Sequence, residues 1–276
     1  RTMCPALWME IVELLDACLP EHQEVLVSYL EPQLEKWEQP GARVRALEVF
    51  AEQALAIGDG DREPVRHALS NLSMQPPSSA RFAPDHWMGE MMQGVTSPKY
   101  RLMRSLDLRY ISASQKMIHR MLTHPELTGL QALYFHASKL PGKNHVEALV
   151  SHDNFASLEL FAPGNVGPFR VKQFTAATQT RFAPKILDLW GYSGDYFSEQ
   201  EQETLVALAR APCFQQVDTL VLERGLGRVT RFVKEVTEHA LMPQLHPRVW
   251  RSFGPVVLGL QEMMPLFERG RKLALA

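Results

Sequence analysis

The chain has 276 residues, of which 45% are hydrophobic and 22% are charged, and its formal net charge at pH 7 is -2. This length can bury a core in one or two domains, and the composition is ordinary for a soluble globular protein. A net charge so close to zero gives no general attraction for nucleic acid or for an anionic membrane, because either would need a basic field. The charge is nevertheless uneven, since the first sixty residues are acidic and the last thirty lean basic.

Residues 1–75 carry helical periodicity and predict an all-α N-terminal region, or cap. Apolar residues recur there at spacings of three and four, which places them on one face of a helix. The first such face contains Leu7, Ile11, Leu14, Leu15 and Cys18, and the second pattern contains Val25, Leu26, Tyr29, Leu30, Leu34 and Trp37. Two further patterns follow. Short proline and glycine turns separate the four patterns and favour antiparallel helical hairpins.

Residues 76–100 are predicted to be a connector. The segment begins with a turn-rich stretch and continues into a methionine-rich segment around Trp87. Methionines at helical spacing are typical of an adaptable core, so we expect this segment to be packed inside rather than to bind a partner.

A different period begins after residue 100. A short strand-like unit of the form large-x-x-Leu-x-Leu occurs five times within residues 101–245, at intervals of roughly 25 to 33 residues, and segments with helical spacing lie between the units. The five units are 103–108, 130–135, 155–160, 184–189 and 217–222. One strand–helix unit cannot bury its apolar face alone, so the pattern indicates units that stack on one another.

These units resemble the leucine-rich-repeat superfamily, in particular its ribonuclease-inhibitor-like branch, over about residues 100 to 245. The repeats are degenerate. The Asn or Cys usual after each strand is replaced by Ile111, Ser138, Pro163, Tyr192 and Gly225. The resemblance implies a curved stack of parallel strands with helices outside. We therefore expect an α/β leucine-rich-repeat-like solenoid of about five repeats, preceded by the all-α region and closed by a C-terminal capping helix at residues 246–276.

The alternation of side chains along each strand predicts a binding face. If the leucines point into the core, the residues between and beside them project from the opposite, concave face. The central ladder is then Asp107, Tyr134, Glu159, Asp188 and Val221, and the next ladder is Arg109, His136, Phe161, Trp190 and Glu223. Aromatic anchors beside charges are what protein interfaces use, and carboxylates select basic partners. We expect these ladders to bind a partner, with Phe161 and Trp190 as exposed anchors.

Catalytic and metal-binding patterns are weaker, and the sequence predicts no catalytic residue, no cofactor and no metal. Residues 191–195 resemble a nucleophile elbow, but Asp195 stands where the closing glycine should be. No histidine pair has metal-ligand spacing and no phosphate loop has its full set of glycines. Cys213 fits a packing position better than a nucleophile. A cation held between Glu159 and Asp188 remains an alternative.

The cysteine pattern favours a reducing compartment. Cys4, Cys18 and Cys213 cannot all pair, and none lies in a CxxC arrangement. No apolar run approaches the roughly 18 to 20 residues that cross a bilayer, and no charged-then-apolar leader is seen. We expect a cytoplasmic protein with no membrane insertion.

The sequence therefore favours a non-catalytic protein–protein interaction module, such as a scaffold, adaptor or inhibitor, whose partner is another protein with a basic or mixed surface. One alternative is a regulator of an enzyme, for example a GTPase-activating protein, for which Arg109 is the nearest candidate for a projecting arginine. The other is structural self-assembly, in which the acidic N-terminal helices meet a basic end of another copy.

Overall fold

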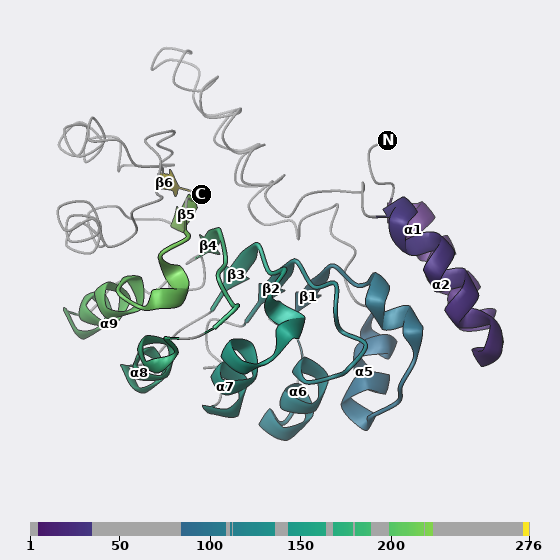
Figure 1. Ribbon diagram of the computed structural model, residues 1–276, viewed down its shortest axis with the longest axis horizontal. Coiled ribbons are helices and arrows are strands. Elements are labelled where there is room, and N and C mark those ends of the chain that lie inside the picture. Colours follow the sequence, from purple (N-terminus) through teal and green to yellow (C-terminus); the bar gives the residue numbers. More distant parts are fainter. Residues whose placement is uncertain are drawn as a thin grey trace, which may run out of the picture.

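The computed structural model describes a chain of helices and short strands (Figure 1). The residues that it describes are 5–34, 84–108, 111, 113–135, 143–163, 168–178, 180–188, 199–217, 219–222 and 273–275. The third and fourth predicted N-terminal helices and most of the predicted C-terminal helix lie outside these residues.

Two helices, α1 (Pro5–Ala17) and α2 (Pro20–Leu34), form the N-terminal part. The helical patterns predicted there are confirmed, but the apolar face predicted for α1 is right only in part, since Leu15 is buried and Ile11 packs against the core. The structure buries Trp8, Val12 and Leu15, whereas Leu7 and Leu14 are exposed. Both sets have helical spacing, so periodicity alone could not tell which set faces the core.

Helix α5 (Asp85–Gln93) follows and is part of the core, as its methionines predicted. Its buried side chains are Trp87, Met88, Met91 and Met92. The helix ends at Gly94, whose φ of 87° is left-handed and whose N–H bonds to the carbonyls of Glu90 and Met91. Glycine adopts this conformation without a Cβ penalty, so it suits the end of a helix. The 3-10 helix η2 (Pro98–Leu102) then leads to the first strand.

The strands form one parallel sheet in which their spatial order follows the chain. They are β1 (Ser105–Asp107), β2 (Ala132–Tyr134), β3 (Leu160–Ala162), β4 (Ile186–Asp188), β5 (Thr219–Leu222) and β6 (Leu273–Leu275). Strand β6 lies where the sequence predicted part of a C-terminal helix, so that prediction is wrong for these three residues. Their backbone groups pair with those of β5 instead.

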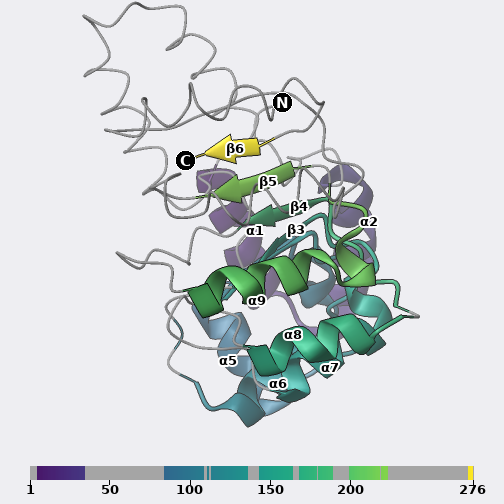
Figure 2. The ribbon, with the colours of Figure 1, turned by 90° about the vertical axis from the view of Figure 1, so that its left-hand side faces the viewer.

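Helices connect successive strands and lie on one side of the sheet. They are α6 (Gln115–Leu122), α7 (Lys143–Ser151), α8 (Pro168–Ala176) and α9 (Glu199–Ala209), with 3-10 turns η3 (Asp153–Phe155) and η5 (Pro212–Phe214) before β3 and β5. Each helix from α5 to α9 packs against the next, which gives the row of helices below the strands in Figure 1 and the stacked helices in front in Figure 2. The predicted α/β class is confirmed.

Residues that point into the core pair with one another along the sheet, but the third unit is shifted relative to the leucine pattern of the sequence. The sheet pairs Leu106 with Leu133, and Leu133 with Phe161. The leucine pattern predicted that Leu133 would pair with Leu158 instead, three residues earlier. Because side chains alternate along a strand, a shift of an odd number of residues exchanges its two faces.

This shift makes the prediction of an exposed Phe161 wrong. The side chain of Phe161 is fully buried. Its ring centroid lies 5.1 Å from that of Phe182, 6.0 Å from that of Phe174 and 6.2 Å from those of Phe135 and Phe214. These rings come from the end of β2, from helix α8, from the segment before β4 and from η5. Aromatic contacts of this kind add to the burial of apolar area, so the core holds the register with Phe161 inside.

We expect Phe161→Ala to lower the free energy of unfolding by about 3 to 5 kcal/mol, because it empties a site between four other rings. Chemical denaturation measures the loss. The control is Lys185→Ala, at an exposed position just before β4, which should change stability by less than about 0.5 kcal/mol. A loss below about 1 kcal/mol for Phe161→Ala would show that the ring is not in the core.

Candidate partner-binding surface

The sheet face opposite the helices was the predicted binding face, and on strands β1 to β4 its side chains are buried except that of Asp107. Side chains on this face form a second cluster of buried hydrophobic residues, made of Ala132, Tyr134, Leu160, Ala162 and Ile186. Ser105 and Asp188 on the same face are also buried, and only Asp107 is partly exposed. At these positions the sheet does not present an open surface to a partner.

The structure brings together only some of the residues that the sequence grouped on this face. Asp107 pairs with Tyr134 in register, as predicted. Glu159 lies before β3 and is partly exposed, and its backbone N–H bonds to the carbonyl of Gln131. The shift of the third unit takes Glu159 out of the central ladder and puts Phe161 in the core. Arg109, His136, Trp190 and Glu223 lie outside the described residues.

The shift also separates the two carboxylates proposed as a cation site. Asp188 follows Leu187, which pairs with Phe161, so Glu159 lies three residues away from the matching position. Within the described part of the chain, no group of three or more His, Cys, Asp or Glu side chains could hold a metal ion. The predicted cation alternative therefore has no geometric support.

Other residues were considered as a nucleophile or as metal ligands, and those that the structure describes have packing or hydrogen-bonding roles. Burial raises the pKa of the Cys213 thiol to about 12, which keeps it protonated at neutral pH and suits the packing position predicted for it. The segment resembling a nucleophile elbow, residues 191–195, lies outside the described residues. Two buried histidines contact backbone carbonyls of neighbouring elements. His145 Nε2 lies 2.8 Å from the carbonyl of Gln115, and His124 Nε2 lies 2.9 Å from that of Val95.

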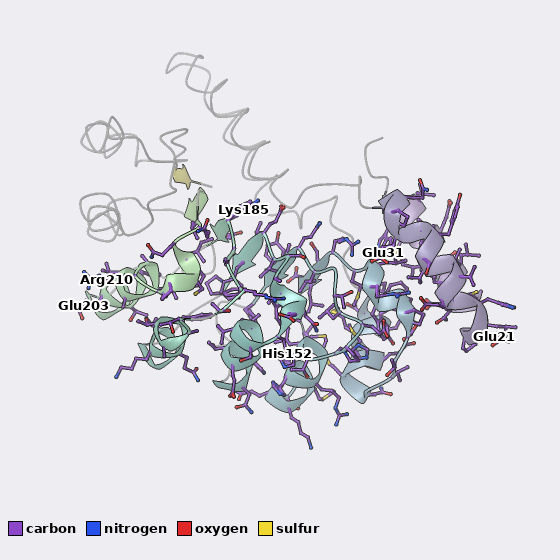
Figure 3. The ribbon with its side chains drawn as sticks, viewed as in Figure 1. Glu21, Glu31, His152, Lys185, Glu203 and Arg210 are labelled. Atoms are coloured by element: carbon purple, nitrogen blue, oxygen red, sulfur yellow. The ribbon has the colours of Figure 1, made fainter. Side chains whose placement is uncertain are left out.

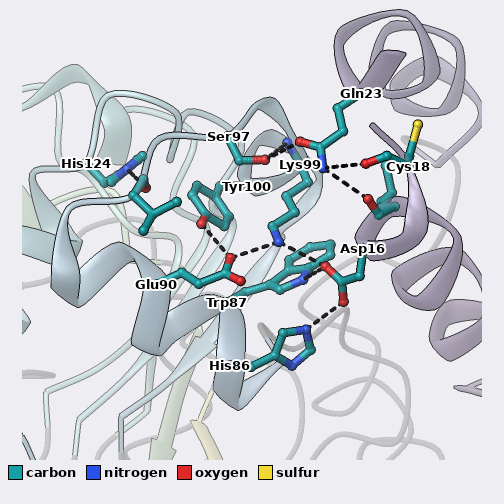
Figure 4. A network of polar contacts seen from close by, with 12 residues as sticks. Asp16, Cys18, Gln23, His86, Trp87, Glu90, Ser97, Lys99, Tyr100 and His124 are labelled. Carbon is teal, nitrogen blue, oxygen red and sulfur yellow. Dashed lines mark hydrogen bonds and ion pairs between the residues drawn. The ribbon is translucent and has the colours of Figure 1, made fainter. Parts of the chain in front are cut away.

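A cluster of charged groups joins α1 to α5 and η2 (Figure 4). At its centre is Lys99, whose side chain is 7% exposed. Its ammonium Nζ lies 2.9 Å from Asp16 Oδ1 and 2.8 Å from Glu90 Oε2, so two carboxylates neutralise it. The same nitrogen lies 5.1 Å from the ring centroid of Trp87 and 5.6 Å from that of Tyr100. Aromatic faces at this distance attract a cation.

The carboxylates in this cluster receive further donors. Trp87 Nε1 donates to Asp16 Oδ1 at 2.8 Å, and His86 Nε2 lies 2.6 Å from Asp16 Oδ2. Partial burial raises the pKa of the Asp16 carboxyl, but the hydrogen bonds from Lys99, His86 and Trp87 together outweigh it, so the pKa lies below its ordinary value. Burial and the hydrogen bond that Tyr100 donates to Glu90 raise the pKa of the Tyr100 hydroxyl.

A second set of contacts fixes the turn between α1 and α2. The buried amide of Gln23 donates to the Leu15 carbonyl at 3.1 Å and accepts from the Ser97 hydroxyl at 2.8 Å. The indole rings of Trp8 and Trp87 meet edge to face at 6.0 Å. Both N-terminal helices are therefore held on α5 and η2 by satisfied polar contacts as well as by apolar packing.

The outer sides of these two helices carry most of the exposed large hydrophobic side chains. Among the described residues, six of the eight such side chains lie on α1, α2 or the turn between them. They are Leu7, Met9, Leu14, Leu19, Val25 and Tyr29, and we call this set the N-terminal apolar surface. Leu7 and Leu14 lie on one side of α1, and Met9 lies on another side. Val25 is 72% exposed and Tyr29 is 66% exposed. On α2, the exposed Val25 and Tyr29 lie one turn apart on the same side, and adjacent exposed apolar residues mark an interaction site more often than isolated ones do.

The same helices are purely acidic. Residues 5–34 contain six carboxylates and no Lys or Arg. Three of the carboxylates face basic side chains of η2 and its flank: Asp16 faces Lys99, Glu24 faces Arg101 at 2.6 Å and Glu31 faces Arg104 at 3.9 Å.

The other three carboxylates, Glu10, Glu13 and Glu21, are exposed. Within the described part of the chain, none of them forms an ion pair. Figure 3 shows Glu21 and Glu31 on the helix pair, far from Glu203 and Arg210 at the other end of the row of helices.

Comparison with protein families, with curated proteins and with solved structures finds no match for this chain. No helix in the described residues has the length and apolarity that crossing a membrane requires.

We expect Lys99→Met to lower the free energy of unfolding by about 2 to 4 kcal/mol, since it leaves two carboxylates without their cation; the partly exposed carboxylates keep some hydration. Chemical denaturation at pH 7 measures the change. Lys116→Met, at an exposed position on α6, is the matched control and should stay within about 0.5 kcal/mol of the wild type. Equal effects of the two substitutions would contradict a role for Lys99 in docking α1.

The lowered pKa of Asp16 gives a pH dependence with a definite sign. The unfolded carboxyl has a pKa of about 3.9, so its stabilising effect is complete above that pH and is lost as the pH falls through the lower, folded pKa. Asp16→Asn should therefore destabilise the protein most near pH 7, and the gap from the wild type should shrink toward pH 3. Unfolding curves at pH 7, 5 and 3 measure this, and a gap that widens toward acid would overturn it.

Proposed function

We propose that the protein is a non-catalytic protein-interaction module, such as a scaffold, adaptor or inhibitor, whose partner has a basic or mixed surface and binds the N-terminal apolar surface. One observation carries the proposal: six exposed hydrophobic side chains gather on two acidic helices that buried contacts hold in place. Interfaces combine apolar anchors with a charged rim, and a preorganised surface loses less entropy on binding.

We further propose that the strand–helix units form a leucine-rich-repeat-like solenoid. Support comes from the parallel strands in chain order, the helices along one side and the equivalent core leucines Leu106, Leu133 and Leu187. The end of such a stack needs a cap. Helices α1 and α2 lie at the β1 end and would serve as this cap as well as the binding surface. A cytoplasmic location is part of the same proposal and is supported by the free thiols of Cys18 and Cys213.

This proposal moves the binding site from the sheet face to the N-terminal helices. The sheet face was predicted to bind through its aromatic and acidic ladders, but Tyr134 and Asp188 are buried there and Phe161 is in the core. The described residues offer no observation that favours an enzyme regulator, because the arginine considered for that role, Arg109, lies outside them. Self-assembly uses the same acidic helices and is an outcome of the experiments below.

We expect the double variant Val25→Ser, Tyr29→Ser to lose a partner that the wild type captures from a native lysate. The substitutions remove two exposed apolar anchors, so the Kd for that partner, once purified, should rise at least about tenfold. Thermal stability should change little, because neither side chain packs inside the protein.

The matched control replaces two exposed hydrophobic residues of the described part of the chain that lie outside the N-terminal helices, Val95→Ser with Met117→Ser. This control should keep the partner. If both double variants capture the same proteins with the same affinity as the wild type, the binding surface is not on α1 and α2, and the proposed site is wrong.

A further inference from the structure

We infer that the partner presents a basic amphipathic α-helix, which lies along the outer side of α2 with its apolar residues on Val25 and Tyr29 and its Lys or Arg side chains near Glu21 and the exposed carboxylates of α1. The inference rests on the proposed function and names the chemistry of the partner. It follows from the arrangement of exposed residues on α2, from their charge and from the kind of chain that can pack on them.

The exposed residues of α2 form a row. Glu21, Val25 and Tyr29 follow one another at intervals of four, so they lie on one side of the helix. This row faces away from the core, because Val25 is two positions, or about 200° around the axis, from the buried Val27. From Glu21 to Tyr29 the row is about 12 Å long, which matches roughly two turns of a partner helix.

Helix α1 repeats the combination of apolar and acidic residues. Leu7, Glu10 and Leu14 follow at intervals of three and four and are all exposed, so a free carboxylate lies one turn from each leucine. On both helices an exposed apolar residue therefore has a carboxylate as its neighbour. A partner that covers the apolar side chains brings its own flanking residues to these carboxylates.

The charge selects a basic partner. Glu10, Glu13 and Glu21 are exposed and form no ion pair with the described residues, while no Lys or Arg occurs in residues 5–34. Like charges across an interface cost free energy and opposite charges speed association, so an acidic partner is disfavoured and a basic one is favoured. The same carboxylates repel an anionic membrane, which would otherwise be a common target of an apolar helical surface.

The geometry selects a helix over an extended strand. The backbone groups of α2 are bonded within the helix, so a strand would find no free sheet edge to pair with. Contact must therefore be made by side chains alone. The side chains spaced four apart form a ridge, and such ridges pack into the grooves of another helix. The partner's anchors are then expected at i, i+3 or i+4, and i+7.

A designed peptide tests this inference on the full chain. The probe is a fluorescent 18-residue amphipathic helix with Leu on one face and Lys elsewhere. One control peptide carries Glu in place of Lys, and another has the same composition with the Leu residues scattered. Fluorescence anisotropy measures the Kd at two salt concentrations. We expect the probe to bind in the micromolar range, as a small interface does, and neither control peptide to bind.

Two variants and two matched controls locate the site. Val25→Ser with Tyr29→Ser should weaken probe binding at least about tenfold, and Val95→Ser with Met117→Ser less than about twofold. Glu10→Gln, Glu13→Gln and Glu21→Gln together should weaken binding and flatten its salt dependence. The charge control is Glu147→Gln, Asp153→Asn and Glu203→Gln, at exposed carboxylates far along the chain, and should leave both unchanged. Circular dichroism checks that all the variants fold.

Several results would overturn the inference. Equal weakening by the two charge variants would mean general attraction to an acidic protein, and equal binding of the scattered-Leu peptide would exclude a helical partner. The Val25→Ser, Tyr29→Ser variant can lose its lysate partner and yet bind the probe with an unchanged Kd. In that case the proposed function stands, and the inference that the partner presents a basic helix is wrong. A dimer of the wild type that these two substitutions abolish would assign the surface to a second copy.

Discussion

The position of the N-terminal helices depends on one buried cation. The side chain of Lys99 is 7% exposed, and an unpaired ammonium at such a site would carry a large desolvation cost. Asp16 from α1 and Glu90 from α5 supply the opposite charges, while Trp87 and Tyr100 place ring faces near the ammonium. Because Asp16 is on a different helix from Glu90, Lys99 has both of its carboxylate partners only when α1 is docked.

The docking of α1 fixes which side of each N-terminal helix faces outward. Once Trp8 meets Trp87 and Gln23 meets Ser97, the exposed sides are those with Leu7, Leu14, Val25 and Tyr29. The acidic residues divide in the same way. Those facing η2 and its flank form ion pairs with Lys99, Arg101 and Arg104, and those facing away are exposed. The proposed binding surface is therefore a consequence of the contacts that hold the cap in place.

In the sheet, the aromatic core plays a comparable role. Phe161 lies between the rings of Phe135, Phe174, Phe182 and Phe214. These residues follow β2, lie on α8, precede β4 and lie in η5, respectively. Its burial sets the register of β3, and that register decides which residues reach the opposite face. With Leu160 and Ala162 there in place of Glu159, the face becomes apolar and buried, and the acidic ladder predicted from the leucines is interrupted.

Much of the local structure follows from the sequence alone. Spacings of three and four predicted the helices α1 and α2 and the core methionines of α5, and the repeated units predicted parallel strands alternating with helices. These features depend on residues close together in the chain. The acidity of the N-terminal helices was also evident from the sequence.

The tertiary structure decided which side of α1 is buried and which side chains of β3 face the helices. Helix α1 has two overlapping apolar stripes, and contacts with residues about eighty positions away, such as that of Trp8 with Trp87, select the inner one. The unit containing β3 has large apolar residues at both Leu158 and Phe161, and rings distant in the sequence select Phe161. Periodicity specifies the spacing of apolar residues, but the side chains that they meet come from other elements, so the choice is made only when the chain folds.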